Sequence, residues 1–201
     1  MPFRTAVSIP VTEPSQVGEA RRTAVAAAQN LGFSEEATAR VGIVATEVGG
    51  NLLKHARGGQ VVVSPLDLTD EVGLEILALD QGRGIENIAR ALTDGYSTAG
   101  TSGTGLGACR RLASHFELHS SAGTGTAVLA QFWERPPPRM PWAPEVEIGG
   151  LSLPHPGEEC CGARWTARLD AGRTLVLVAD GLGHGRYAAE AAEGVIQVFK
   201  T

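Results

Sequence analysis

Cysteine is scarce in this sequence, and its three cysteines have neither the spacing of a disulfide framework nor that of a metal site. Cys109 stands alone, whereas Cys160 and Cys161 are adjacent. The simplest interpretation is thiols in a reducing compartment. No apolar run approaches the roughly 18 residues that span a bilayer, and the N-terminus lacks the continuous apolar segment of a signal peptide. These absences predict a soluble, cytoplasmic protein without a membrane partner.

Positive charge is also limited. The chain has 17 lysines and arginines against 22 acidic residues, which gives a formal net charge of -5. This balance argues against nucleic acid as a partner. The 201 residues suit one ordinary domain plus part of another, and an apolar fraction of 43% is enough for a packed core.

Closely spaced prolines divide the chain at ERPPPRMPWAPE, residues 134–145. Such a segment favours a stiff, extended linker over a helix or a central strand. The sequence therefore predicts a first domain over residues 1–133, a linker over 134–145, and a second, shorter part over 146–201.

Apolar periodicity in the first domain predicts an α/β sandwich, with helices on one face of a mixed, mostly antiparallel sheet. Ser34 is the expected N-cap of the second helix, because two glutamates follow it in the first turn. The expected elements are a strand at 5–11, helices at 13–30 and from 35 to about 56, strands at 60–63 and 73–79, a helix from 106 to about 116, and a hairpin at 117–121 and 127–132.

Two consecutive glycines interrupt the second helix in TEVGGNLLKH, residues 46–55. Each costs about 1 kcal/mol relative to alanine in a helix interior. Helical spacing puts Gly50 on the side of Glu47, where a missing side chain lets a ligand approach, and places Asn51 one turn after Glu47. Gly49 lies further round, where helix packing is the expected reason. The alternative is that both glycines only let the helix sit tightly on the sheet.

Two further glycine motifs follow. In LALDQGRGI, Asp80 ends an apolar strand before Gly82 and Gly84, so its carboxylate can accept from an exocyclic amine; the alternative is an ordinary turn. In GTSGTGLGACRR, glycine-rich backbone opens a helix near Leu106, and a helix N-terminus favours a phosphate. The second motif is neither a P-loop nor a Rossmann fingerprint.

The order of these motifs resembles the GHKL-type ATP-binding (Bergerat) fold of gyrase, heat-shock chaperones, histidine kinases and MutL. Within it, residues 1–133 are most similar to the anti-sigma-factor serine kinases, especially the switch kinases of the stressosome. The resemblance implies that Asn51 binds magnesium and that Asp80 recognises the adenine amino group. It further implies the rest of the site: Gly82 and Gly84 shape the adenine pocket, residues 95–104 with Gly103 and Thr104 form an ATP lid, Gly105, Leu106 and Gly107 meet the phosphates, and Thr126 supports the adenine end.

The role of Glu47 distinguishes hydrolysis of ATP from phosphoryl transfer to a hydroxyl group. A carboxylate one turn before the magnesium ligand can orient a water for the first reaction or take a proton from an incoming hydroxyl for the second. In the serine kinases that the chain resembles, it is the general base. The alternative is an exposed helix carboxylate. Lys54 is expected either to contact a phosphate or to complement the dipole at the helix C-terminus. His55 is expected to be a packed histidine. Arg110 and Arg111 are expected to be solvated or to bind the acidic face of a partner.

The second part resembles the opening of a bacterial, SpoIIE-like metal-dependent serine phosphatase domain. In TLVLVADGLGHG, the resemblance implies that the carboxylate of Asp180 and the carbonyl of Gly181 bind Mg²⁺ or Mn²⁺. The family has an aspartate where CGARW has Ala163, and the later carboxylates of the metal site do not follow. We therefore expect this part to be an incomplete and catalytically silent segment.

These observations predict an ATP- and Mg²⁺-dependent serine/threonine protein kinase that phosphorylates a STAS-domain antagonist in stress or sigma-factor regulation. A sigma factor or another downstream regulator is a further candidate partner. The alternative is a non-catalytic switch, an anti-sigma factor in which nucleotide only selects the partner. A histidine kinase is disfavoured because no helical hairpin with a phosphoacceptor histidine precedes the domain.

Overall fold

The computed structural model describes residues 6–66, 72–93, 105–135, 146, 148–155 and 157–201. The described residues form two compact units, one containing Ser8–Leu66 and Gly73–Glu134 and the other containing most of the chain after residue 134. None of the helices in these ranges is both long and apolar enough to cross a membrane.

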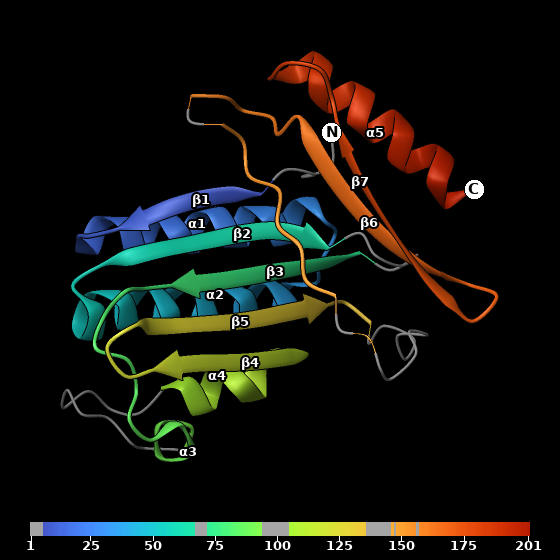
Figure 1. Ribbon diagram of the computed structural model, residues 1–201. Helices are drawn as coiled ribbons and strands as arrows, with labels where there is room; N and C mark the ends of the chain where they lie inside the picture. Colours follow the sequence, from blue (N-terminus) through green and yellow to red (C-terminus); the bar gives the residue numbers. More distant parts are fainter. Residues whose placement is uncertain (1–5, 67–71, 94–104, 136–145, 147, 156) are drawn as a thin grey trace. The chain divides into compact units, whose positions relative to one another are not determined.

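The first unit is a sheet of five strands in the order β1-β2-β3-β5-β4 (Figure 1). The pairs β2/β3, β3/β5 and β4/β5 are antiparallel. The strands are β1 (Val7–Val11), β2 (Gly59–Leu66), β3 (Gly73–Leu79), β4 (His115–Ser121) and β5 (Gly125–Trp133). This arrangement confirms the predicted helices on a mostly antiparallel sheet.

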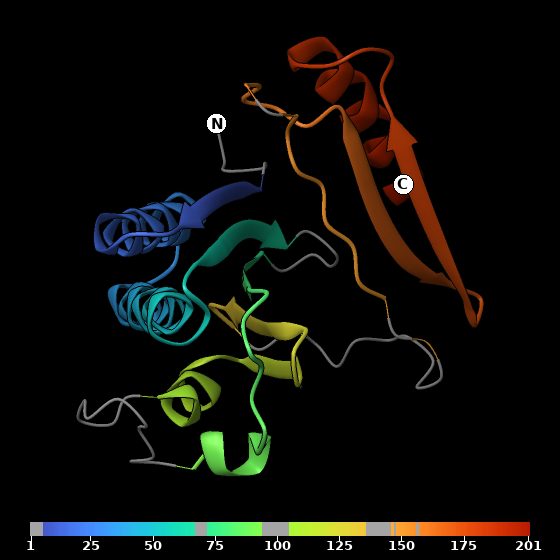
Figure 2. The same ribbon diagram turned by 60° about the vertical axis from the view of Figure 1, so that its left-hand side comes forward.

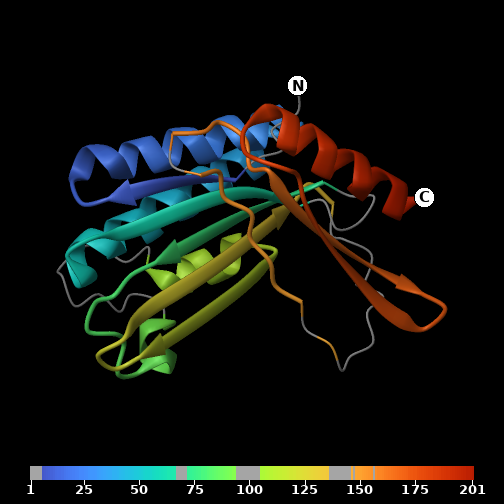
Figure 3. The same cartoon turned by 45° about the horizontal axis from the view of Figure 1, so that its top comes forward.

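Two long helices, α1 (Pro14–Asn30) and α2 (Glu35–Asn51), lie on one face of this sheet (Figures 2 and 3). Helix α1 begins with a capping box, in which the Gln16 side chain accepts from the Glu13 N–H at 3.0 Å. Helix α2 begins at Ser34 as expected, and the Ser34 hydroxyl accepts from the Ala37 N–H at 3.3 Å.

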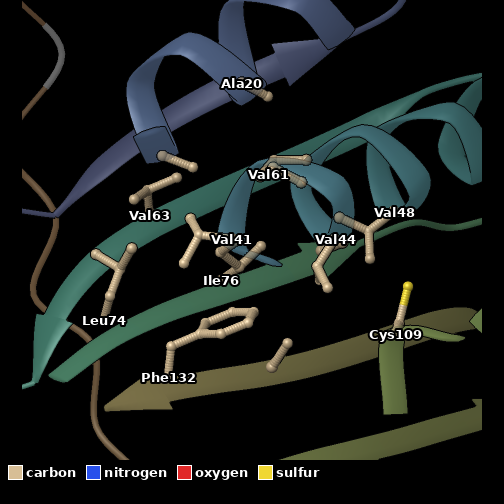
Figure 4. Packing of buried hydrophobic residues seen from close by; sticks show 14 of the residues in the cluster. Ala20, Val41, Val44, Val48, Val61, Val63, Leu74, Ile76, Cys109 and Phe132 are labelled. Atoms are coloured by element: carbon tan, nitrogen blue, oxygen red, sulfur yellow. The ribbon is translucent and has the colours of Figure 1, made fainter. Parts of the chain in front are cut away.

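The core of this unit lies between α2 and the sheet. Val41, Val44 and Val48 of α2 point toward Ile76 and Phe132 of the strands (Figure 4). All five side chains are at most 2% exposed, so the valine stripe seen in the sequence is the buried face of the helix. That orientation places the opposite edge of α2, with Glu47, outside the packed stripe.

The helical segment reaches Ala56, as the sequence indicates, but its last turn is not α-helical. Its α-helical bonding stops at Asn51, and Leu52–Ala56 form a single π-helical turn, η1. Leu52 O accepts from the backbone N–H groups of Arg57 and Gly58, and Arg57 takes the left-handed conformation with φ 63°. Periodicity alone does not separate a π turn from a last α turn, which explains the error.

Helix α4 (Leu106–Leu112) is shorter than predicted, since it was expected to reach Phe116. Ala113 is extended with ψ 149°, the Ser114 N–H donates to Gln131 O at 2.8 Å, and Phe116 pairs with Ala130 in the sheet. Residues 115 and 116 therefore pair with β5 as part of a strand and do not continue the helix. A short helix, α3 (Ile88–Ala91), capped by Asn87, was not anticipated.

The second unit is a hairpin of β6 (Ala163–Asp170) and β7 (Arg173–Asp180) with helix α5 (Arg186–Lys200) on one face. Ala179 of β7 and Ala192 and Ile196 of α5 form its small buried cluster. An ion pair of 2.5 Å between Arg164 and Glu193 holds the same face. The opposite face includes Val176 and Val178, which are 55% and 71% exposed.

Candidate functional site

Several element ends of the first unit meet at one end of the sheet (Figure 1): the end of α2 with η1, the end of β3, and the turn between β4 and β5. Their backbones are close. A Cβ added at Gly59 would lie 2.3 Å from Leu79 O and 3.3 Å from the Cβ of Asp80, and one added at Gly82 would lie 2.8 Å from Ala56. The motifs around Asn51 and Asp80, separated in sequence, are therefore brought to the same place.

Asp80 follows β3 and is held by backbone donors. Its Oδ1 accepts from the Gly82 N–H at 2.7 Å and from the Thr126 N–H at 3.2 Å, while its own N–H donates to Thr126 O at 3.0 Å. The two bonds to Oδ1 orient the carboxylate, and the third holds the backbone of Asp80 against β5. The group still has acceptor capacity on its second oxygen, as recognition of an amine requires.

The glycines next to Asp80 are required by close backbone approach. Gly84 has φ +74°, and a Cβ there would lie 2.3 Å from Ser121 O. Gly125 has φ +115°, and a Cβ there would lie 2.0 Å from Asp80 O. Any side chain at these positions would push the loop away from the hairpin. The D-x-G-x-G motif thus shapes one wall of the site together with the β4–β5 turn.

Ser120 is also part of this wall, although no sequence motif singles it out. Its hydroxyl accepts from the Ile85 N–H at 2.8 Å, donates to Gly125 O at 2.9 Å and lies 3.0 Å from the Thr126 hydroxyl. Ser120 therefore connects the loop after Asp80 to the strand that carries Thr126. A lone serine in a strand offers no pattern from which this role can be read.

Glu47 and Asn51 are both partly exposed on α2, one turn apart. The two glycines between them differ as their spacing suggested. A Cβ at Gly49 would lie 3.3 Å from a methyl group of Val17 on α1, whereas a Cβ at Gly50 would meet nothing of the described chain within 4 Å. Gly49 therefore serves helix packing. Gly50 leaves the surface beside Glu47 low and open.

Two titratable groups report the electrostatics around Glu47. Burial, and then the negative charge of Glu47, raises the pKa of the Cys109 thiol to about 12, so Cys109 stays protonated. Burial, followed by the nearby charges of Arg83 and Lys54, lowers the pKa of His55, and Asp80 and Glu47 act in the opposite direction. The shift favours the neutral imidazole, so His55 is not a charged partner for either carboxylate.

The phosphate motif lies partly outside the described residues, which exclude Gly103, Thr104 and the rest of the expected lid. Gly105 is the N-cap of α4, and its carbonyl accepts from Ala108 at 2.9 Å. Leu106 and Gly107 are buried in the first turn of α4, which packs against α2. The start of α4 is therefore close to the helix that carries Glu47 and Asn51.

In the second unit, Asp180 is exposed at the end of β7 and pairs in register with Ala163 of β6. The Gly181 N–H donates to Gly162 O at 3.0 Å, and a Cβ at Gly181 would lie 2.2 Å from Ala188 O. Within the described ranges, no group of three or more His, Cys, Asp or Glu side chains is placed to hold a metal ion.

The first unit is similar in sequence to known proteins. Residues 11–132 match the histidine kinase-like ATPase domain family. The chain is 38% identical over 108 residues to the serine/threonine-protein kinase RsbT of Bacillus subtilis (strain 168), which covers 54% of this chain and 81% of RsbT. Among solved structures, the mycobacterial sensor histidine kinase MprB aligns with a TM-score of 0.38 and 19% identity, over 48% of this chain and 71% of that one.

The family match spans more than half of the chain and includes each element that forms the site, from the end of β1 to β5. The expected GHKL-type fold and the expected enzyme class are therefore confirmed. The chain belongs to the histidine kinase-like ATPase domain family, and its enzyme class is that of a serine/threonine-protein kinase.

Proposed function

We propose that the first unit transfers the γ-phosphoryl group of ATP to a serine or threonine of a STAS-domain antagonist, as a kinase of the anti-sigma or stressosome switch type. The observation that carries this proposal is the carboxylate of Asp80, oriented by the N–H groups of Gly82 and Thr126 at the end of the sheet where α2 also ends. Similarity to a serine/threonine kinase of known class supports the same chemistry.

Asp80 would accept a hydrogen bond from the adenine amino group, and the positions of Gly82, Gly84 and Gly125 let the loop and hairpin close around a flat ring. Thr126 and Ser120 would hold that wall in place, since their hydroxyls lie 3.0 Å apart. Guanine has no amino group at the corresponding ring position, so we expect adenine to be preferred.

Asn51, at the end of α2, would supply the amide oxygen that a hard cation prefers. The open surface at Gly50 fits a metal and triphosphate there, because a Cβ would meet nothing of the described chain within 4 Å. Bound Mg²⁺ would neutralise charge that develops on the phosphoryl oxygens. The phosphates would be contacted by the start of α4, with Gly105, Leu106 and Gly107, and by residues 103 and 104 before it.

Glu47 would accept the proton of the incoming hydroxyl. Asn51 lies one turn further along the same helix edge, so the base and the metal ligand have a fixed relative position. The protonated thiol of Cys109 adds no negative charge next to this carboxylate. A carboxylate in this position contributes by general base catalysis, typically a factor of about 10² to 10⁴ in rate.

We further propose that residues 134–145 link this kinase to a phosphatase-like segment, residues 146–201, that is catalytically silent. Asp180 would meet Ala163 across the hairpin, where a second carboxylate is needed for a metal site.

Incubation of the full chain with γ-³²P-ATP, Mg²⁺ and purified STAS-domain antagonists tests the kinase assignment. We expect label on serine or threonine of one antagonist, and little label with γ-³²P-GTP. Nucleotide binding without transfer to any antagonist would instead favour the non-catalytic switch, and equal use of GTP would contradict the role of Asp80.

A further inference from the structure

One end of the first unit carries a group of basic side chains that the proposed chemistry does not use, apart from the interpretation of Lys54 as a phosphate contact. We name it the basic rim: Lys54 and Arg57 around η1, and Arg83 in the loop after Asp80. All three are exposed. They belong to a chain whose formal net charge is -5, so this local excess of positive charge departs from the chain as a whole.

Backbone contacts bring the two parts of the rim together. The Cα and Cβ of Ala56 lie 2.8 Å from where a Cβ would stand at Gly82, so Arg83 emerges beside η1. Arg83 O also accepts from the Gly123 N–H at 3.0 Å, which ties the loop to the hairpin. Arg57 directly follows the π turn, and its left-handed backbone, with φ 63°, ends that turn.

The rim adjoins the transfer site. The π turn begins directly after Asn51, and the loop of Arg83 begins directly after Asp80. The charge of Arg83 lowers the pKa of His55 more than that of its neighbour Lys54 does, as expected for a guanidinium close to the imidazole. Among the ion pairs of the described residues, none includes Lys54, Arg57 or Arg83. Their charges are thus directed to solvent or to a partner.

We propose that Arg57 and Arg83 form a docking surface for an acidic patch on the protein whose hydroxyl group is phosphorylated. This inference rests on the proposed kinase function. Complementary charge at the edge of an active site raises the rate of encounter and fixes the orientation of a protein partner. Nucleic acid is the poorer occupant, because a few permanent cations on an acidic protein cannot follow a phosphate backbone, which typically engages about 6 to 10 contacts.

The experiment compares Arg57→Gln, Arg83→Gln and the double variant with Arg22→Gln, which removes the same charge from an exposed position on α1. Glutamine keeps most of the side-chain length and leaves the loop backbone unchanged. Unchanged thermal unfolding would verify that each variant is folded. The measurements are the KM for the unphosphorylated antagonist, the kcat, and the Kd for Mg-ATP, at low and high NaCl.

We expect each rim variant to raise the KM for the antagonist by about 3- to 10-fold, with kcat and the Kd for Mg-ATP within about twofold of the wild type. The wild-type KM should rise with NaCl, and that dependence should be flatter in the double variant. Arg22→Gln should match the wild type. An unchanged KM in the double variant would overturn the proposal, and so would a loss of ATP affinity, which would assign these arginines to the nucleotide.

A second arm does not depend on transfer. Poly-L-glutamate serves as an acidic polypeptide, and duplex DNA as the competing anion. Should no antagonist be phosphorylated, the kinase proposal fails, yet the rim is still tested: the wild type should bind poly-L-glutamate at least several-fold more tightly than the double variant. Equal binding of poly-L-glutamate by both, or a preference for DNA that the double variant loses, would reject an acidic protein as the occupant.

Discussion

Asp80 shows how a single side chain is prepared for recognition by its backbone surroundings. Two N–H donors, from Gly82 and Thr126, engage the same carboxylate oxygen at 2.7 Å and 3.2 Å. The sequence placed Asp80 at a strand end but contained no sign of the bond from Thr126, which lies 46 residues away. Such a contact depends on the pairing of β3 with β5, which local periodicity does not encode.

Asp80→Asn tests this residue. The amide keeps an oxygen for the two backbone donors, but its NH₂ group would then face the adenine amine as a second donor. We expect the Kd for Mg-ATP to rise about 10-fold or more, since a hydrogen bond to a charged group contributes about 1.5–3 kcal/mol. Isothermal titration calorimetry measures the change. The control is Glu86→Gln, which changes an exposed carboxylate in the same loop. An unchanged Kd for Mg-ATP in Asp80→Asn would exclude adenine recognition by Asp80.

Glu75 is a titratable residue away from the site, in the middle of β3. Its carboxylate accepts from the Gln131 side chain at 2.8 Å and from Ser64 at 3.5 Å. Burial raises the pKa of Glu75 above its usual value, although both hydrogen bonds act against the shift. The folded state therefore holds this proton more tightly than the unfolded chain does.

The sign of the linkage follows from that raised pKa. The contribution of Glu75 to stability is complete below the pKa of the unfolded chain, near 4.5, and is lost as the pH rises through the folded value. Glu75→Gln should therefore gain stability relative to the wild type as the pH rises from 4 to about 8. Calorimetric unfolding across this range measures it, with the exposed Glu19→Gln as control. A difference that shrinks with rising pH would show the opposite linkage.

At the scale of elements, helix α2 links packing to chemistry. Its valine stripe is buried against the sheet, Gly49 packs against Val17 of α1, and a Cβ at Gly50 would meet nothing of the described chain within 4 Å. The helical period alone separated the two glycines into a packing position and an open position. The π turn after Asn51 was not predicted, because η1 has the composition of an ordinary final turn.

Gly50→Ala tests the use of that open space. Without a ligand, the added methyl group meets nothing of the described chain, so helix propensity should stabilise the variant by about 0.5–1 kcal/mol. If the helix edge borders metal and triphosphate, the same methyl group should weaken Mg-ATP binding several-fold. Chemical denaturation and calorimetry measure both effects. The comparison variant is Gly49→Ala. If Gly50→Ala binds Mg-ATP as tightly as the wild type, the phosphates do not lie beside Gly50.

The two ends of α4 illustrate what sequence patterns resolve. The start at Leu106 was predicted, because glycines precede an apolar helical pattern. The end was not, since Leu112 and Phe116 fit both a helical stripe and the alternation of a strand. Pairing of β4 with β5 decides in favour of the strand. Long-range pairing of this kind can be read only from the folded chain.

At the scale of the whole molecule, most elements of the first unit were predictable because each has strong local periodicity. The ligand roles of the site residues remain predictions. The grouping of their motifs at one end of the sheet was predictable in outline, because the order of these short motifs is itself informative. The contribution of Ser120 and the shape of η1 were not, since they arise where strands and loops that are distant in sequence come together. The lid residues, among them Gly103 and Thr104, remain predictions outside the described residues.

The second unit gives a prediction for the full chain. Because Ala163 lies opposite Asp180, the hairpin offers one carboxylate where a metal site requires several. We expect the full chain with Mn²⁺ to release no phosphate from a phosphorylated antagonist, and Ala163→Asp to bring no activity. Release of inorganic phosphate measures this, with a known Mn²⁺-dependent phosphatase as the positive control. Mn²⁺-dependent release by the wild type would show a complete catalytic site.

The central claim is that Glu47 acts as the base while Asn51 holds the metal, and parallel measurements of nucleotide binding and phosphoryl transfer in two variants test it most directly. Asn51→Ala should weaken Mg²⁺-dependent ATP binding and abolish transfer together. Glu47→Gln keeps the shape but cannot accept a proton, so its Kd for Mg-ATP should stay within about twofold while the transfer rate falls by roughly 10² or more. Transfer at the wild-type rate by Glu47→Gln would contradict the account.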